Sequence, residues 1–343
     1  MVEVAPRTGE IKINYWRYIA FLVLLALLGL GTVWTMYSSS WGASNPFAEW
    51  LRKYLSLANR FRPNAKPEDN LANALRLHGI EKLGEKRYAV LFTATDANGD
   101  PLTTVRAADL EIQLGTDAAA RQRALVDRVV PLHMMNQPDP VAFAGVMDYS
   151  GSMFPEDISA IESNFTAFLN AVVLPFSGTI IKFNNTVNTM NPLTPNKGDI
   201  EAAVKKPVPL ENTAFYSGID KGIADIQARR WMRFLLLTTD GNDNASGHTL
   251  EEVITRARQH FVSGFVLGFG WLNVGILKQI AEETDGYYVY VPDSSQLTTW
   301  FPKIAKIVNN VQVAEVSLPT DANLPLSVSI TLNANGTRLQ RSR

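Results

Sequence analysis

The chain has 343 residues, of which 46% are hydrophobic and 19% charged, a composition typical of a globular protein of about two domains. Its formal net charge is −1, so the composition gives no indication of a nucleic-acid partner. The chain has no cysteine, which excludes disulfide scaffolds, thiol catalysis and iron–sulfur centres. Its histidines lack the HExxH spacing of zinc hydrolases.

The first predicted element is a membrane-spanning helix over residues 18–37. These residues, YIAFLVLLALLGLGTVWTMY, carry no charge and would extend about 30 Å as a helix, the thickness of the hydrocarbon layer. A cleavable signal peptide is the alternative, but its apolar region is only about 7–15 residues long. Three basic residues precede the span, namely Arg7, Lys12 and Arg17. No Lys or Arg follows in residues 38–51, so the positive-inside rule predicts a cytoplasmic tail over residues 1–17.

This orientation places the rest of the chain outside the membrane, in the periplasm or the extracellular space. Residues 46–62 are then predicted to form a juxtamembrane amphipathic helix, because apolar side chains recur there at helical spacing with basic residues between them. Two alternatives stay open for this helix: it lies on the lipid surface, or it packs on the following domain or on a partner. Residues 63–70, PNAKPEDN, are typical of a linker.

The chain from residue 63 to 140 is predicted to be the first part of a β-sandwich, with strands over residues 87–95, 110–114 and 125–132. The segment DANGD at residues 96–100 has some likeness to a calcium loop. However, Pro101 stands where an EF-hand requires glycine, which favours a hairpin turn.

From residue 141 to 310 the pattern changes to apolar strands that alternate with amphipathic helices. Strands are predicted over residues 141–147, 179–183, 233–238, 264–269 and 287–291, and helices over 155–173, 197–205, 215–228, 249–261, 274–283 and 294–310. This order predicts a doubly wound α/β domain with a mostly parallel sheet. Residues 311–343 return to strand patterns, over 311–318 and 326–332, and are predicted to complete the β-sandwich, so the α/β domain is inserted within it.

Five polar side chains are predicted to share one edge of the parallel sheet. Asp148, Ser150 and Ser152 follow the first apolar strand, Thr213 precedes a helix, and Asp240 follows another apolar strand. Because ligands bind at the carboxyl ends of parallel strands, we expect an all-oxygen metal site there. Such a set suits Mg²⁺ or Mn²⁺, with Ca²⁺ as an alternative. The competing interpretation is that the two aspartates are helix caps without a metal.

Residues 141–310 resemble a von Willebrand factor A domain. The sequence DYSGS at 148–152, Thr213 and the sequence TDG at 239–241 are similar to the metal-ion-dependent adhesion site of that family, and KQIAEETDGYYVYVPDSSQL at 278–297 resembles its terminal helix–strand–helix. The family usually has two glycines where this chain has Asp285 and Gly286. Residues 89–114 are similar to the β-rich stretch that precedes such domains in bacterial envelope proteins.

The resemblance implies a role for each residue of the set. Ser150 and Ser152 would be direct metal ligands, Thr213 would bind directly or through water, and Asp148 and Asp240 would bind largely through water. An Asp or Glu of a partner protein would complete the coordination. We therefore expect a membrane-anchored interaction module in a cell-envelope assembly, such as a secretion, pilus or motility apparatus.

A free-standing adhesin or ligand receptor is the alternative function. A metal-dependent phosphatase or a chelatase-like subunit is less favoured, because no base or nucleophile is assignable beside the metal and Asp148 stands where a G-x-S-x-G elbow needs its first glycine. The sequence therefore predicts that the protein is not an enzyme.

Overall fold

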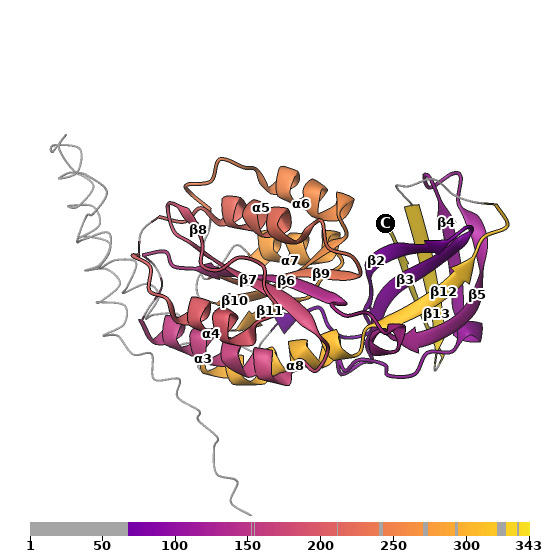
Figure 1. Ribbon diagram of the computed structural model, residues 1–343, viewed down its shortest axis with the longest axis horizontal. Coiled ribbons are helices and arrows are strands. Elements are labelled where there is room, and N and C mark those ends of the chain that lie inside the picture. The colour runs from indigo at the N-terminus through magenta and orange to yellow at the C-terminus, as the bar shows by residue number, and fades with distance from the viewer. Residues whose placement is uncertain are drawn as a thin grey trace, which may run out of the picture. The chain divides into compact units, whose positions relative to one another are not determined.

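The computed structural model (Figure 1) describes residues 68–151, 153, 155–210, 212–239, 243–269, 274–291, 294–320, 327–334 and 336–343. The predicted cytoplasmic tail, membrane helix and amphipathic helix, at residues 1–17, 18–37 and 46–62, lie outside these residues. None of the helices within them is long and apolar enough to cross a membrane.

The α/β domain is built on a seven-stranded sheet of order β1-β11-β10-β9-β6-β7-β8. Its strands are β1 (Glu68–Asp69), β6 (Val141–Asp148), β7 (Phe176–Phe183), β8 (Val187–Thr189), β9 (Met232–Thr239), β10 (Val262–Phe269) and β11 (Tyr288–Val291). The five inner strands are parallel, and the edge strands β1 and β8 run antiparallel to their neighbours. The predicted, mostly parallel sheet is confirmed.

Helices cover both faces of this sheet, as the prediction of a doubly wound domain requires (Figure 1). One face carries α3 (Pro155–Ala171), α4 (Lys197–Lys205) and α8 (Leu297–Asn309), and the other carries α5 (Phe215–Ile226), α6 (Leu250–Gln259) and α7 (Val274–Glu283). Beneath the first group lies an aromatic cluster in which the rings of Phe143 and Phe234 stack with centroids 5.7 Å apart. Phe143 and Phe234 are paired residues of β6 and β9, so the cluster packs against the amino halves of these two strands.

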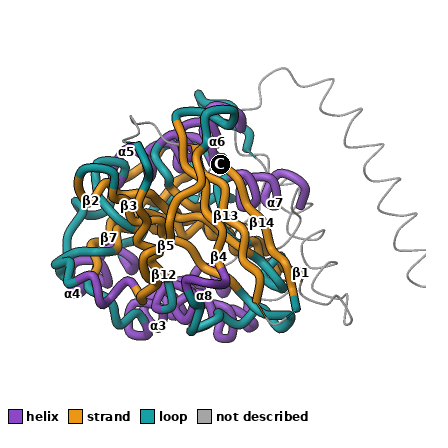
Figure 2. Tube along the Cα trace, turned by 90° about the vertical axis from the view of Figure 1, so that its right-hand side faces the viewer, coloured by secondary structure: helices purple, strands orange, loops and turns teal. Residues whose placement is uncertain are grey.

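The remaining strands form one antiparallel sheet of order β14-β13-β4-β5-β12-β3-β2, seen in the foreground of Figure 2. They are β2 (Leu75–Gly84), β3 (Arg87–Ala94), β4 (Leu110–Gly115), β5 (Gln122–Pro131), β12 (Gln312–Ser317), β13 (Ser327–Ala334) and β14 (Thr337–Ser342). The prediction of a two-layered sandwich is wrong. Residues 122–124 of β5 pair with β4 while residues 125–131 pair with β12, so a single sheet curls around its own core as a half-barrel.

Because β12 follows α8 and pairs with both β5 and β3, the α/β domain is inserted between two strands of the curved sheet. The sequence patterns missed β1, β2, β8 and β14. Of these, β1 lies within the predicted linker, residues 63–70, and pairs with β11 at the edge of the α/β sheet. Strand β2 alternates apolar and polar residues only over residues 75–78, because its pairing with β3 shifts register between Leu77 and Gly79, so the alternation does not run along the whole strand.

The curved sheet contacts the α/β domain at the amino ends of the parallel strands. Glu81 of β2 accepts a hydrogen bond from the backbone N–H of Trp231, just before β9, at 2.8 Å. His78, also of β2, lies 2.9 Å from the hydroxyl of Ser263 in β10. Eight-residue strands extend about 26 Å, so the carboxyl ends, where the predicted metal site lies, are far from this contact.

Candidate metal centre

Asp148 is the last residue of β6 and is fully buried at the carboxyl end of the parallel sheet. One carboxylate oxygen, Oδ1, accepts the backbone N–H of Ser150 at 2.8 Å, and the other, Oδ2, accepts the hydroxyl of Thr239 at 2.6 Å. Hydrogen bonds from the protein therefore hold both oxygens and fix the plane of the carboxylate. A carboxylate held in this way suits the predicted role of reaching a metal through water.

Ser150 and Thr213 are the two predicted hydroxyl ligands within the described residues, and both are buried. The backbone carbonyl of Ser150 accepts the N–H of Met153 at 3.0 Å, which closes a turn after β6. Thr213 precedes α5, and its N–H donates to the side-chain oxygen of Asn244 at 2.8 Å. Its carbonyl in turn accepts the backbone N–H of Asn244 at 2.9 Å. The loop after β9 thus holds Thr213 in place.

The end of β7 brings these two segments together. The carbonyl of Phe183, its last residue, accepts the N–H of Tyr149 at 2.8 Å, and the carbonyl of Asn184 accepts the N–H of Ala214. The segments that carry Asp148, Ser150 and Thr213 are therefore tied to consecutive residues of one strand end. Ser152 and Asp240, the other predicted members, lie outside the described residues.

The donors within the described part of the set are one carboxylate and two hydroxyls, all oxygen, which is the chemistry that a hard divalent cation takes. Clusters of three or more His, Asp or Glu side chains that could hold a metal do not occur among the residues that the structure describes. The predicted site is not a cluster of this kind, because only two of its five residues, Asp148 and Asp240, have a carboxylate.

Sequence patterns missed two contributors to this edge. Thr239 ends β9 and holds Asp148, and Asn244 holds Thr213. The signal for Thr239 was its place directly before Asp240, at the end of a buried strand. Asn244 gave no comparable signal, because small polar residues are common in any loop.

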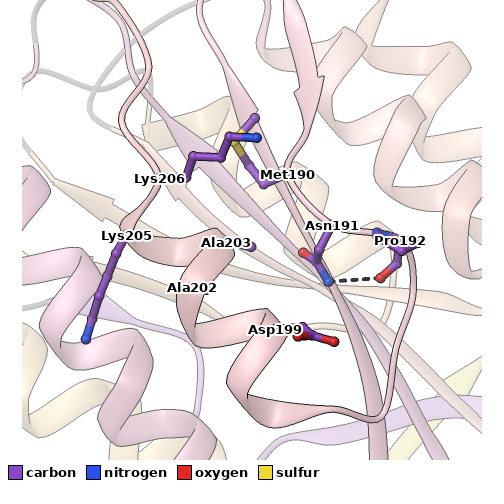
Figure 3. Close-up of a pocket in the computed structure, with 8 residues that line it drawn as sticks. All are labelled: Met190, Asn191, Pro192, Asp199, Ala202, Ala203, Lys205 and Lys206. Carbon is purple, nitrogen blue, oxygen red and sulfur yellow. Dashed lines mark hydrogen bonds between the residues drawn. The ribbon is translucent and has the colours of Figure 1, made fainter.

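A surface cavity of about 480 Å³ lies beside α4, between that helix and the loop after β8 (Figure 3). Its ionisable residues are Asp199, Lys205 and Lys206, and Lys205 points away from Asn191 (Figure 3). The amide of Asn191 is occupied by the backbone groups of Gly178, Ile180 and Pro192. The polar groups of this cavity do not converge, so it is not the candidate site.

Residues 144–303 match the family model of the von Willebrand factor type A domain. No curated protein matches the chain.

Several solved structures are similar. BatB from Bacteroides thetaiotaomicron is 18% identical, with 49% of this chain and 98% of that one covered and a TM-score of 0.41. A von Willebrand factor type A protein from Catenulispora acidiphila is 13% identical, with 82% and 74% covered and a TM-score of 0.45. Proximal thread matrix protein 1 from the mussel byssus, with a zinc-occupied MIDAS motif, is 16% identical, with 53% and 48% covered and a TM-score of 0.44. The match of residues 144–303 to the family model, together with the doubly wound sheet, identifies the inserted domain as a member of the von Willebrand factor type A family.

Proposed function

We propose that the protein binds a divalent metal at the carboxyl edge of its α/β sheet and uses the metal to bind a carboxylate of a partner protein. Ser150, Ser152 and Thr213 would hold the metal through their hydroxyls, and Asp148 and Asp240 largely through water. The observation that carries the proposal is the buried carboxylate of Asp148, whose two oxygens are held by Ser150 and Thr239 beside buried hydroxyl groups.

The chemistry of the donors supports the choice of ligand. Hydroxyls and water are neutral, so a metal held mainly by them keeps positive charge that the protein does not neutralise. Such a cation attracts an external carboxylate, and the contact is strong where the site is partly shielded from water. Mg²⁺ or Mn²⁺ fits this set best, with Ca²⁺ as an alternative.

We further propose that this module is anchored in a bacterial inner membrane by residues 18–37 and works outside it in a cell-envelope assembly. Support comes from the uncharged span and from the few residues, 63–67, between the predicted amphipathic helix and β1. A domain tethered so closely stays near the bilayer, as a subunit of a membrane assembly would. The alternative is a free-standing adhesin or receptor, and we assign no catalytic residue.

Thermal unfolding of the full chain tests the metal. A ligand that binds only the folded state raises the melting temperature, so millimolar Mg²⁺ should raise that of the wild type. Asp148→Ala should lose this increment, whereas Asp199→Ala, which removes an exposed carboxylate on α4, should keep it. An equal increment in Asp148→Ala would refute the assignment.

Purification of the full chain in mild detergent tests the setting. A stoichiometric complex with other envelope proteins supports the assembly, and recovery of the chain alone supports the free-standing receptor. Repeating the purification with EDTA shows whether the metal holds the partner, because a metal-bridged contact dissociates when the metal is removed.

A further inference from the structure

Lys182 of β7 is a lysine whose side chain is completely buried, and its backbone pairs with Met147, the residue before Asp148 of the candidate metal centre. Its ammonium group donates hydrogen bonds to the hydroxyl of Tyr149 and to the carbonyls of Val204 and Lys206, each at 2.6 Å. A carboxylate oxygen of Glu162 lies 3.3 Å away. The three protons of the ammonium thus meet three acceptors, and Glu162 provides the opposite charge.

Tyr149 is the residue that connects this lysine to the predicted site, since it stands between Asp148 and Ser150. Its hydroxyl donates to Glu162 of α3 at 2.5 Å, and its ring lies 4.2 Å from the Lys182 nitrogen, a cation–π contact. The carboxylate of Asp148 accepts hydrogen bonds from the N–H of Ser150 and the hydroxyl of Thr239, so the two flanking residues lie at the metal edge. The side chain of Tyr149 is instead held by residues of α3 and β7.

Burying a lysine is costly, and a structure keeps one only where its partners are well placed. Desolvation lowers the pKa of Lys182 to about 8, with Glu162 acting in the opposite direction. The same network raises the pKa of the Tyr149 hydroxyl, because burial and the neighbouring Glu162 both disfavour its ionised form. An apolar residue would fill this position in a buried strand without the desolvation penalty of an ammonium group. We therefore expect the lysine to have a role beyond packing.

We propose that Lys182 is a positioning residue for the metal loop: it anchors the side chain of Tyr149 and so sets the backbone that presents Asp148 and Ser150 to the cation. This inference rests on the proposed metal-binding function. Lys182 also holds the carboxyl end of α4 through the carbonyls of Val204 and Lys206, so α4 is coupled to the metal loop through one side chain.

The direction in which the metal affinity changes when Lys182 is replaced distinguishes a positioning role from a purely electrostatic effect. Removing a positive charge near a cation site would, by electrostatics alone, tighten cation binding. Loss of positioning would weaken it, and side chains that orient metal ligands typically contribute about 10-fold to 100-fold in affinity. Lys182→Met, which keeps an unbranched side chain but removes the charge and the donors, is therefore expected to bind Mn²⁺ about tenfold more weakly.

The experiment is calorimetric titration of Mn²⁺ into the full chain, with the melting temperature without metal measured in parallel. Tyr149→Phe, which keeps the ring and loses the hydroxyl, should weaken binding in the same direction. The double variant should bind Mn²⁺ no more weakly than Lys182→Met, because both substitutions break the same connection between Lys182 and Tyr149. Lys205→Met, which removes an exposed charge on α4, should leave the affinity unchanged.

Each outcome decides between the alternatives. Unchanged or tighter Mn²⁺ binding in Lys182→Met, with or without a lower melting temperature, would reduce Lys182 to a structural residue and overturn the proposal. Fully additive losses in the double variant would overturn the route through Tyr149. Failure of the wild type itself to bind Mn²⁺ would instead refute the proposed function.

Discussion

The carboxylate of Asp148 shows how single residues prepare the candidate site. Buried carboxylates are tolerated where their oxygens accept hydrogen bonds, and here a backbone N–H and the hydroxyl of Thr239 fill that role. Thr239 and its neighbour Thr238 are both fully buried in β9. Their side chains point to opposite faces of the sheet, because residues alternate along a strand.

Thr239→Val should therefore weaken Mg²⁺ binding by about tenfold, because Asp148 loses the donor that orients it. It should also lower the free energy of unfolding by about 1–2 kcal/mol. Thr238→Val is the matched control: the hydroxyl oxygen of Thr238 has no hydrogen-bond partner within the described chain. Titration of both variants checks this expectation, and equal affinities would contradict it.

The predicted metal ligands could be found from the sequence because their spacing is recognisable. The residues that hold these ligands in place could not. Asp148 and Ser150 lie two residues apart on one turn, Thr213 precedes a predicted helix, and Asp240 follows a predicted buried strand. Lys182 lies in a strand that the sequence predicts correctly. Nothing local shows that its partners come from Tyr149, Glu162 and the end of α4, since only the packed fold brings them together.

At the scale of elements, the contact between β2 and β10 depends on one histidine. His78 is fully buried, with ring nitrogens 2.9 Å from the hydroxyl of Ser263 and 2.8 Å from that of Thr93. Desolvation lowers its pKa to about 3, helped by the positive charges of Arg343 and Arg76. The folded protein therefore holds this imidazole neutral.

This depressed pKa makes folding sensitive to acid. Above pH 6.5 His78 is neutral in both states, whereas between about pH 6.5 and 3 the unfolded chain takes up a proton that the folded chain refuses. This histidine alone should thus cost stability progressively as the pH falls through that range, up to roughly 5 kcal/mol.

His78→Gln should flatten the dependence of the unfolding free energy on pH across this interval. His133→Gln, which replaces an exposed histidine, should leave it unchanged. Denaturant unfolding at pH 7, 5.5 and 4 measures both. A slope in His78→Gln as steep as that of the wild type would show that other groups cause the acid sensitivity.

The elements themselves were predicted unevenly. All six helices predicted for the α/β domain are present, because each has one clear apolar stripe. The prediction of a sandwich is wrong, because the first residues of β5 pair with β4 and the later ones with β12, and no change in the sequence pattern marks this division. Strand β14 was missed because its side chains are mostly exposed and polar.

At the scale of the whole molecule, Asp285 links the inserted domain to the curved sheet. It lies between α7 and β11, is almost completely buried, and its carboxylate contacts Arg341, Arg343 and the backbone N–H of Leu77. This contact accounts for an aspartate at this position, although its φ of 58° lies in the left-handed region that favours glycine. Its neighbour Gly286 cannot be replaced, since a Cβ there would lie 1.9 Å from the carbonyl oxygen of Gly264.

Asp285→Gly should relieve about 1 kcal/mol of backbone strain. It would leave the two arginines without their buried counter-charge, which costs about 3–5 kcal/mol, so the variant should unfold at lower denaturant concentration. Lys86→Gly is the control, because Lys86 has a similar φ of 56° but is exposed. If Asp285→Gly were as stable as Lys86→Gly, the ion pairs would not join the two parts.

The proposed divalent metal at the carboxyl edge of the α/β sheet can be detected by titrating the full chain with Mn²⁺ and following the free ion by electron paramagnetic resonance. One Mn²⁺ should bind per chain and be displaced by excess Mg²⁺, and Ser150→Ala should lose this binding. Absence of saturable binding to the wild type, or equal binding by Ser150→Ala, would contradict the proposed site.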